Sequence, residues 1–490
     1  MNYSHFYFLG IGGIGMSAIA RYFHHNGYEV RGYDRTPSPL TRELENEGID
    51  IVYDETMQTA PWNINDWTKA DTLVVRTPAV PHEQEIYTFL REQQFTILKR
   101  AEVLGLITQH NKALCVAGTH GKTTTSTILA HLMKQSHVGT NAFLGGVSNN
   151  YHSNLLIDTN SDYVVVEADE YDRSFHHLTP FMSVITSVDP DHLDIYGTAE
   201  AYRESFAHYA SLVQNTIVIK KSACAEIESR KSEVGHPQAP SKEGGCKKVE
   251  SRKSEVESRK QIYTYAVNEV ADFYADNICV NEGTITFDFH SPTTTIAHLQ
   301  LGVPVWVNIE NSVAAIAIAM LNGVTEEEVR HGLATFAGVY RRFNVHVNTP
   351  QVAYIDDYAH HPTELEASIR SIRQLFPQRH IVGVFQPHLY TRTRDFADGF
   401  AAVLSQLDEV ILLPIYPARE LPIPGVTSDM LLDKITCPRK RLVQKNELVE
   451  TLQSLSQQSS PVAIITLGAG DIDRLVPDIA LRLQPNETNS

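Results

Sequence analysis

A strand, a glycine-rich turn and a helix follow one another without a break from Lys112 to Met133. The run KALCVA has the apolar content of a buried strand, and the turn GTHGKTT follows it directly. The next residues place four apolar side chains on one face of a helix, namely Ile128, Leu129, Leu132 and Met133. Strands that alternate with helices in this way pack as parallel layers, so the segment predicts an α/β fold.

The same alternation occurs on both sides of this segment. Before it lie the strand-like runs HFYFLGI, YEVRGYD and DTLVVRTPAV, and beyond FAGVYRRF lie VAYIDDY, IVGVFQP, EVILLPIY and VAIITLGAG. A chain of 490 residues is too long for one core and accommodates about three domains. We therefore predict three α/β domains in series, over residues 1–109, 110–338 and 339–490.

Two helix starts are marked by the sequence. Thr363 and Glu366 fit a capping box ahead of the helix that follows VAYIDDY. Asn311 is expected to open the small-residue helix ENSVAAIAIAML.

One segment of the central domain, about residues 222–260, breaks the alternation. It is polar and repetitive, with IESRKSEV, VESRKSEV and ESRK in succession. Such a sequence has too little apolar surface to order itself into a core, which predicts a surface insertion. An arm that binds a partner is the alternative.

Composition excludes several classes of protein. A formal net charge of −17 would repel nucleic acid and anionic membranes, so neither is an expected partner. The sequence shows no secretion signal and no apolar run of about 18 residues, which predicts a cytoplasmic protein without membrane insertion. Its five scattered cysteines include no CxxC pair and predict reduced thiols. A monomer and a homodimer are both compatible with the sequence.

The turn GTHGKTT has the residues of a nucleotide phosphate site. Gly118 and Gly121 allow turns that aim backbone N–H groups at phosphate, Lys122 supplies a positive charge, and the hydroxyl of Thr123 is a ligand for Mg²⁺. Val116 stands where the general P-loop pattern has its first glycine. A structural turn that matches by chance is the alternative.

A second glycine turn, FLGIGGIGMS, lies near the N-terminus. Gly10, Gly12 and Gly15 form a G-x-G-x-x-G pattern between a strand and a helix, and Asp34 ends the next strand. A carboxylate at that position reaches a nucleotide ribose, so this turn alone favours a nicotinamide oxidoreductase. Tight packing of the strand on the helix is the other explanation of these glycines.

Acidic and basic residues cluster at the ends of later strands. Glu167 and Asp169 end the strand DYVVVEADEYD, where a carboxylate is well placed to hold Mg²⁺. His192, in DPDHLDIY, is either a metal ligand or a loop cap. In YRRF, an arginine of the pair Arg341 and Arg342 could neutralise a γ-phosphate during transfer. Two further polar clusters, DDYAHHPTE and QPHLYTRTRD, follow strands of the last domain.

Eight motifs in order, namely FLGIGGIGMS, GTHGKTTT, EADEYD, DHLDIY, FAGVYRRF, DDYAHHPTE, QPHLYTRT and TLGAGDI, resemble those of the Mur ligase family. The resemblance implies a Rossmann-like N-terminal domain, a central P-loop ATPase-like domain and a Rossmann-like C-terminal domain. It also implies an enzyme of cytoplasmic peptidoglycan synthesis that uses ATP and Mg²⁺ to join L-alanine to UDP-N-acetylmuramate through an acyl phosphate. The alternatives are a ligase that attaches a murein tripeptide to the same UDP-sugar, a nicotinamide oxidoreductase and a nucleotide-dependent scaffold.

The resemblance also assigns roles to residues. It implies three catalytic residues, Lys122, His192 and Arg342, and three metal ligands, Thr123, Glu167 and His192. The implied ATP-binding residues are Gly118, Thr119, His120, Gly121, Lys122, Thr123, Thr124, Asn311 and Asp357. The implied UDP-sugar-binding residues are Gly12, Gly13, Gly15, Asp34, Tyr358, His360, His388 and Arg392.

Three positions depart from the pattern of the family: Ser187, Val307 and Leu389 replace a usual asparagine, histidine and arginine. No lysine occurs between His192 and Val218, so the carbamylated lysine of some family members is predicted to be absent.

Overall fold

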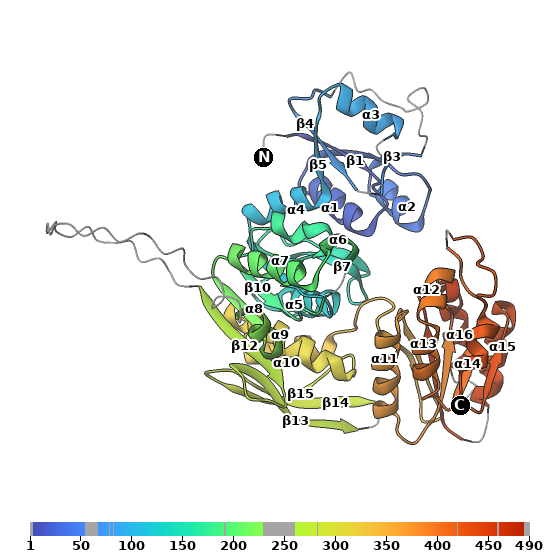
Figure 1. Cartoon of the computed structure of the whole chain (residues 1–490). Coiled ribbons are helices and arrows are strands. Elements are labelled where there is room, and N and C mark those ends of the chain that lie inside the picture. The colour runs from blue at the N-terminus through green and yellow to red at the C-terminus, as the bar shows by residue number, and fades with distance from the viewer. Residues whose placement is uncertain are drawn as a thin grey trace, which may run out of the picture.

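The computed structural model describes residues 3–53, 67–77, 79–81, 83–190, 193–228, 260–281, 283–418, 420–457 and 460–484 (Figure 1). Its strands form three separate sheets in chain order. This arrangement confirms the prediction of three α/β domains in series. The predicted boundaries, after residues 109 and 338, fall between the sheets and stay a prediction.

The N-terminal sheet is parallel, with strand order β3-β2-β1-β4-β5. Its strands are β1 (His5–Leu9), β2 (Glu29–Tyr33), β3 (Asp50–Val52), β4 (Thr72–Arg76) and β5 (Thr96–Lys99). The helices are α1 (Ile14–His25), α2 (Pro39–Asn46), α3 (Glu85–Glu92) and α4 (Arg100–Gln109). Phe6 of β1 stacks on Phe23 of α1 with the ring centroids 3.7 Å apart, which seats α1 on the sheet directly after the first glycine turn.

The central sheet has ten strands in the order β15-β14-β13-β12-β11-β10-β6-β9-β7-β8. Its middle is parallel, and antiparallel pairs form at both edges. The strands are β6 (Lys112–Ala117), β7 (Asn141–Ser148), β8 (Ser153–Leu156), β9 (Tyr163–Glu167), β10 (Met182–Ile185), β11 (Thr216–Lys220), β12 (Gln261–Val267), β13 (Phe273–Asn281), β14 (Thr284–His290) and β15 (Thr295–Gln300). The helices are α5 (Lys122–Gln135), η2 (Tyr171–His177), α6 (Leu193–Tyr196), α7 (Ala199–Leu212), α8 (Lys221–Glu228), α9 (Trp306–Leu321) and α10 (Glu326–Thr335). The N-terminal ends of β6 and β9 therefore lie together, and so do their carboxyl ends.

Two sequence predictions for this domain need correction. Helix α9 begins at Trp306 and not at Asn311, because the apolar residues before ENSVAAIAIAML already follow the helical pattern. The predicted insertion begins later than residue 222, since α8 continues to Glu228 and buries Ala223. The remainder of the insertion, residues 229–259, lies outside the described residues.

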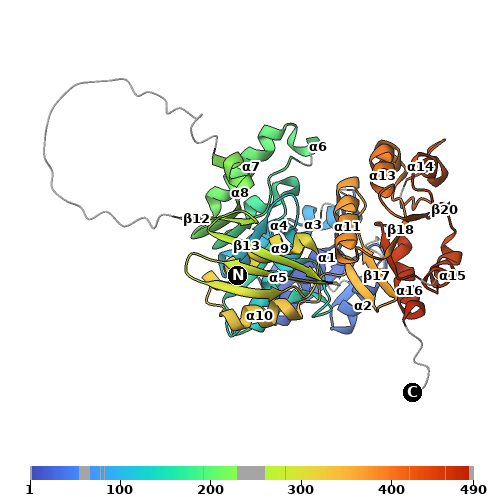
Figure 2. The same cartoon turned by 90° about the horizontal axis from the view of Figure 1, so that it is seen from below.

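The C-terminal sheet has the order β16-β17-β21-β18-β19-β20, and only the edge strand β16 runs antiparallel within it. The strands are β16 (Asn344–Asn348), β17 (Val352–Asp357), β18 (His380–Phe385), β19 (Glu409–Leu412), β20 (Lys440–Leu442) and β21 (Val462–Leu467). The helices are α11 (Pro362–Leu375), α12 (Tyr390–Asp395), α13 (Ala397–Leu404), α14 (Ser428–Lys434), α15 (Lys445–Ser456), η3 (Asp471–Leu475) and α16 (Val476–Leu483). In Figure 2, α11 and β17 lie on the side of this domain that faces the central one.

The predicted capping box of α11 was wrong. The N-cap is His361, whose ring accepts from the backbone N–H of Thr363, and Glu364 accepts from the backbone N–H of His361. Pro362 fits the first helical position because its fixed φ is already helical, and this moves the start of the helix before Thr363.

Helices of the described part are too short or too polar to cross a membrane. Cys115, Cys279 and Cys437 are free thiols, in agreement with the prediction of reduced thiols for these three.

Candidate active site

The turn between β6 and α5 is shaped by its two glycines. Gly118 has a φ of +135°, and a Cβ there would lie 2.9 Å from the backbone nitrogen of Ser187 and closer still to Thr186 Oγ1. Gly121 caps α5 with a φ of +81°, and its Cβ would lie 2.8 Å from Asn311 Oδ1. Only glycine fits both positions, and the turn leaves the amides that open α5 directed at an incoming anion.

Lys122, the first residue of α5, is folded back onto its own turn. Its Nζ donates to the carbonyl oxygen of Gly118 at 2.7 Å and forms an ion pair with Glu170 Oε2 at 2.6 Å. Only 2% of the Glu170 side chain is exposed, and burial raises its pKa while Lys122 opposes that rise. The positive charge predicted to meet phosphate is therefore neutralised by a buried carboxylate in this structure.

Sequence reasoning missed Glu170. It placed Glu167 and Asp169 at the carboxyl end of the strand DYVVVEADEYD, but β9 ends at Glu167. Beyond that residue the chain turns into η2, and Glu170 is the N-cap of this helix. The available signal was the lysine of the P-loop motif, which needs a partner wherever it is buried.

Thr123 and Glu167 form the candidate metal site. Thr123 Oγ1 donates to Glu167 Oε1 at 3.1 Å, and Glu167 Oε2 is buried with no hydrogen-bond partner. Burial raises the pKa of Glu167, and the nearby Lys122 opposes the rise. A hydroxyl beside an unsatisfied buried carboxylate oxygen fits Mg²⁺, which prefers oxygen ligands.

His192, the third expected metal ligand, lies outside the described residues. Within the part of the chain that is described, no three His, Cys, Asp or Glu side chains gather as a metal cluster.

Asn311 lies behind the glycine turn. Its Oδ1 accepts from Thr125 Oγ1 at 3.1 Å, and its Nδ2 donates to Asn308 Oδ1 at 3.2 Å. The residue is buried and supports the start of α5 from α9. Val307 on the same helix is exposed.

The two arginines of YRRF have different environments. Arg341 is buried, donates to the carbonyl oxygen of Gly468 at 2.5 Å and lies 3.4 Å from Asp356 Oδ2. Arg342 is exposed, and its positive charge lowers the pKa of Glu167 and of Asp357 against the dominant effect of burial on both. Arg342 therefore acts electrostatically on carboxylates of two domains, whereas Arg341 is part of the C-terminal core.

The other C-terminal candidates form a group beyond β17 and β18. Burial raises the pKa of Asp357 to about 6, and Ser368 donates a hydrogen bond to its carboxylate. The Tyr358 and His360 rings are in edge contact at 5.1 Å, and the His388 ring stacks on Tyr416. Burial lowers the pKa of His360, and Arg392 adds to that decrease, so α12 lies near the end of β17.

Leu389, at the start of α12, departs from ordinary backbone geometry. It has a φ of +67°, in a region that residues other than glycine seldom adopt. Glu420 accepts from both the backbone N–H and the hydroxyl of Thr391, which fixes this strained helix start.

The first glycine turn is closed by Asp34. The backbone N–H of Gly12 donates to Asp34 Oδ2 at 2.7 Å, and a Cβ on Gly12 would lie 2.8 Å from that oxygen. In this structure the carboxylate of Asp34 holds the glycine turn, and its predicted contact with a ribose stays a prediction.

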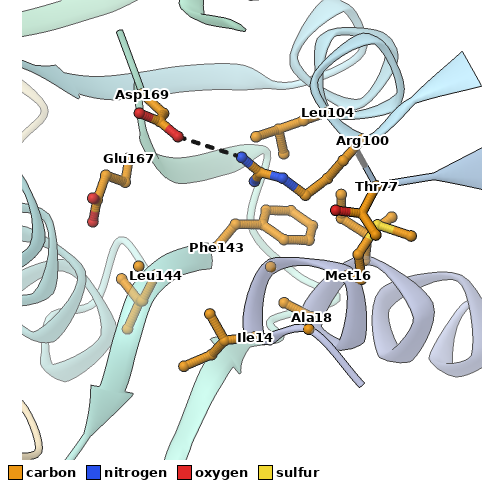
Figure 3. Close-up of a pocket in the computed structure, with 14 residues that line it drawn as sticks. Ile14, Met16, Ala18, Thr77, Arg100, Leu104, Phe143, Leu144, Glu167 and Asp169 are labelled. Atoms are coloured by element: carbon orange, nitrogen blue, oxygen red, sulfur yellow. Dashed lines mark ion pairs between the residues drawn. The ribbon is translucent and has the colours of Figure 1, made fainter. Parts of the chain in front are cut away.

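Gly13 and Gly15 line a cavity of about 350 Å³ between the N-terminal and central domains (Figure 3). Glu167 and Asp169 line it from the central domain, and Arg100 and Thr77 line it from the N-terminal domain. Among the described residues around it, none comes from the C-terminal sheet. The structure thus brings the first glycine turn to the candidate metal ligand, while the C-terminal candidates remain a separate group.

Family models match most of the chain in three stretches. They are the Mur ligase family catalytic domain over residues 5–112, the Mur ligase middle domain over 116–237 and the glutamate ligase domain of Mur ligases over 341–470.

Curated relatives match nearly the whole length. The UDP-N-acetylmuramate–L-alanine ligase of Porphyromonas gingivalis is 52% identical, with 98% of each chain covered. The ligase of the same name from Parabacteroides distasonis is 54% identical, with 96% of each covered. Among solved structures, the UDP-N-acetylmuramate-alanine ligase of Thermotoga maritima matches with a TM-score of 0.73 at 26% identity, over 98% of each chain.

Proposed function

The chain belongs to the Mur ligase family, and from this premise we propose that it joins L-alanine to UDP-N-acetylmuramate with conversion of ATP to ADP and phosphate. The product is an amide needed for peptidoglycan synthesis. ATP and UDP-sugars are metabolites of the cytoplasm, so the proposed place of action is the cytoplasm.

The observation that carries the proposal is the shared position of Glu167. Its carboxylate accepts from Thr123 beside the second glycine turn, and it lines the cavity that contains Gly13 and Gly15 of the first. Two phosphate-binding turns that converge on one acid suit a reaction between two nucleotide-bearing substrates. A nicotinamide oxidoreductase would use only the first turn.

In the proposed reaction, phosphorylation gives the carboxyl group of the sugar nucleotide a better leaving group. A carboxylate oxygen of the sugar nucleotide attacks the γ-phosphorus of ATP, and the bond from that phosphorus to ADP breaks. The amine of alanine, after losing its extra proton, attacks the carbonyl carbon of the acyl phosphate and expels phosphate. Phosphate is a far better leaving group than hydroxide, which is why the first step is needed.

Side chains of this protein would neutralise the charge that develops. Lys122 leaves Glu170 for the outer phosphates of ATP, and Arg342 approaches the γ-phosphate from the C-terminal domain. Thr123 and Glu167 would hold Mg²⁺, with His192 as a further expected ligand. The cation would supply charge neutralisation between the phosphates. Asp357 would bind the ATP ribose, and the group of Tyr358, His360, His388 and Arg392 would hold the reacting end of the sugar and the amino acid.

A substrate-pair assay tests the proposal. The protein is incubated with ATP, Mg²⁺ and UDP-N-acetylmuramate together with either L-alanine or the murein tripeptide, and phosphate release is measured. We expect release with L-alanine and its loss in Lys122→Ala. Release only with the tripeptide would instead establish the ligase that attaches a murein tripeptide to the same UDP-sugar. Tight NADH binding without binding of the UDP-sugar would establish the oxidoreductase.

A further inference from the structure

Arg100 is a cavity residue to which the sequence gave no role. It is the first residue of α4, and its side chain extends into the cavity between the N-terminal and central domains (Figure 3). A Cβ built on Gly15 would lie 3.0 Å from Arg100 Nη1 and 3.2 Å from Cδ. The side chain of Arg100 therefore lies directly against the first turn of α1.

The ion pair between Arg100 and Asp169 is weak. The Nη2 atom is 3.7 Å from Asp169 Oδ2, and the side chains of Arg100 and Asp169 are 30% and 41% exposed. An ion pair this long and this exposed contributes little to stability. The guanidinium is therefore easily transferred to a stronger anion.

The cavity offers such an anion two kinds of donor. The backbone N–H groups of Ile14 and Gly15 belong to the first turn of α1, where a helix has no internal acceptor for them. Arg100 adds a planar fork of N–H donors that matches phosphate oxygens. Opposite them, the partnerless buried Oε2 of Glu167 marks the end of the cavity that suits a cation.

We propose that Arg100 binds the diphosphate of the sugar nucleotide and exchanges its contact with Asp169 for that diphosphate. The inference rests on the proposed function, which supplies the ligand. It assigns Arg100 to the sugar nucleotide and not to ATP, because the P-loop cation, Lys122, is not among the described residues that line this cavity. The glycine at position 15 is required for the same reason, since any side chain there would displace the guanidinium.

The experiment compares Arg100→Ala with Lys99→Ala. Lys99 is the matched control because it is the adjacent residue and forms a similar ion pair to the central domain, with Asp172 at 3.1 Å, but does not line the cavity. Affinities of the full-length protein for UDP-N-acetylmuramate, UDP, UMP and a non-hydrolysable ATP analogue are measured by calorimetry. Arg100→Lys is included as the conservative variant.

We expect Arg100→Ala to weaken binding of UDP-N-acetylmuramate and UDP by about 10- to 100-fold, and binding of UMP by less. Arg100→Lys should recover part of the loss, and Lys99→Ala should bind like the wild type. Unchanged affinity for the ATP analogue in Arg100→Ala would show that the variant is folded and that the effect is local.

Three results would overturn the inference. The first is an unchanged affinity for UDP in Arg100→Ala. The second is an equal loss of UDP affinity in Lys99→Ala, which would attribute the effect to the contact between domains, and the third is an equal loss of affinity for the ATP analogue in Arg100→Ala. Failure of the proposed function is distinguished separately, because it would appear as absence of alanine-dependent phosphate release by the wild type. Release by the wild type with unaltered UDP binding in Arg100→Ala would reject only the role of Arg100.

Discussion

Replacement of Gly145 by alanine tests the proposed metal site without changing a proposed ligand. A Cβ on Gly145, in β7, would lie 2.6 Å from Cδ and 2.7 Å from Oε1 of Glu167, and closer still to Oε2. Ordinary contacts begin at 3.4 Å, so the carboxylate must retreat by roughly 1 Å. Mg²⁺ holds its oxygen ligands at about 2.0 to 2.1 Å and tolerates little distortion, so a retreat of this size removes the ligand.

The expected result is a loss of Mg²⁺ affinity in a folded protein. Displacement of a metal ligand or of its support typically costs about 10- to 100-fold, so the Mg²⁺ concentration for half-maximal turnover should rise by that factor. Stability should be preserved, because Gly145 is exposed and alanine costs less conformational entropy than glycine in a strand.

The assay is phosphate release as a function of Mg²⁺, together with thermal unfolding. Glu167→Gln provides the reference for complete loss of the carboxylate. Because both changes act on one ligand, Gly145→Ala combined with Glu167→Gln should be little worse than Glu167→Gln alone. A wild-type Mg²⁺ dependence in Gly145→Ala would refute the assignment of Glu167 as a metal ligand.

Three further predictions follow from the ion pairs and the buried acids. Glu170→Gln should tighten binding of an ATP analogue several-fold in calorimetry, because Lys122 no longer has to leave a carboxylate; unchanged or weaker binding would contradict this role of Glu170. Arg342→Ala should lower turnover far more than affinity for the UDP-sugar. Arg341→Ala should instead lower the unfolding temperature, since of the two arginines only Arg341 is buried in the C-terminal core. The opposite pattern in kinetics and thermal unfolding would reverse the two roles. The folded-state pKa of Asp357, about 6 against an ordinary 3.8, means that its contribution to stability is complete below pH 4 and is lost as the pH rises through 6. Asp357→Asn should therefore gain about 3 kcal/mol relative to the wild type between pH 4 and pH 7, and a difference independent of pH in thermal unfolding would show that Asp357 is not buried as described.

The sequence predicted best those features that depend on residues close together in the chain. Alternating strands and helices predicted the three α/β domains, and the turn at Gly118 and Gly121 was predicted from its own residues. Both glycines adopt backbone angles that disfavour other residues, so their identity was sufficient evidence.

Features that depend on distant partners were not predictable in this way. Glu170 meets Lys122 only because the turn after β9 brings it to the start of α5, and Arg100 reaches Gly15 only because α4 begins beside α1. The hydrogen bond from Gly12 to Asp34 was not predicted for the same reason, since it depends on the loop geometry at Gly12. The start of α11 was misplaced because the ring of His361, which is seldom an N-cap, replaced the expected threonine.

The acids after β9 connect the two glycine turns. Asp169 contacts the cation that faces the first glycine turn, and its neighbour Glu170 contacts the cation of the second. A phosphate at either turn would compete with one of these adjacent carboxylates for its cation, so we expect the two sites to be coupled, and such coupling is reciprocal. The factor by which bound ATP changes the affinity for the sugar nucleotide must therefore equal the factor by which the sugar nucleotide changes the affinity for ATP.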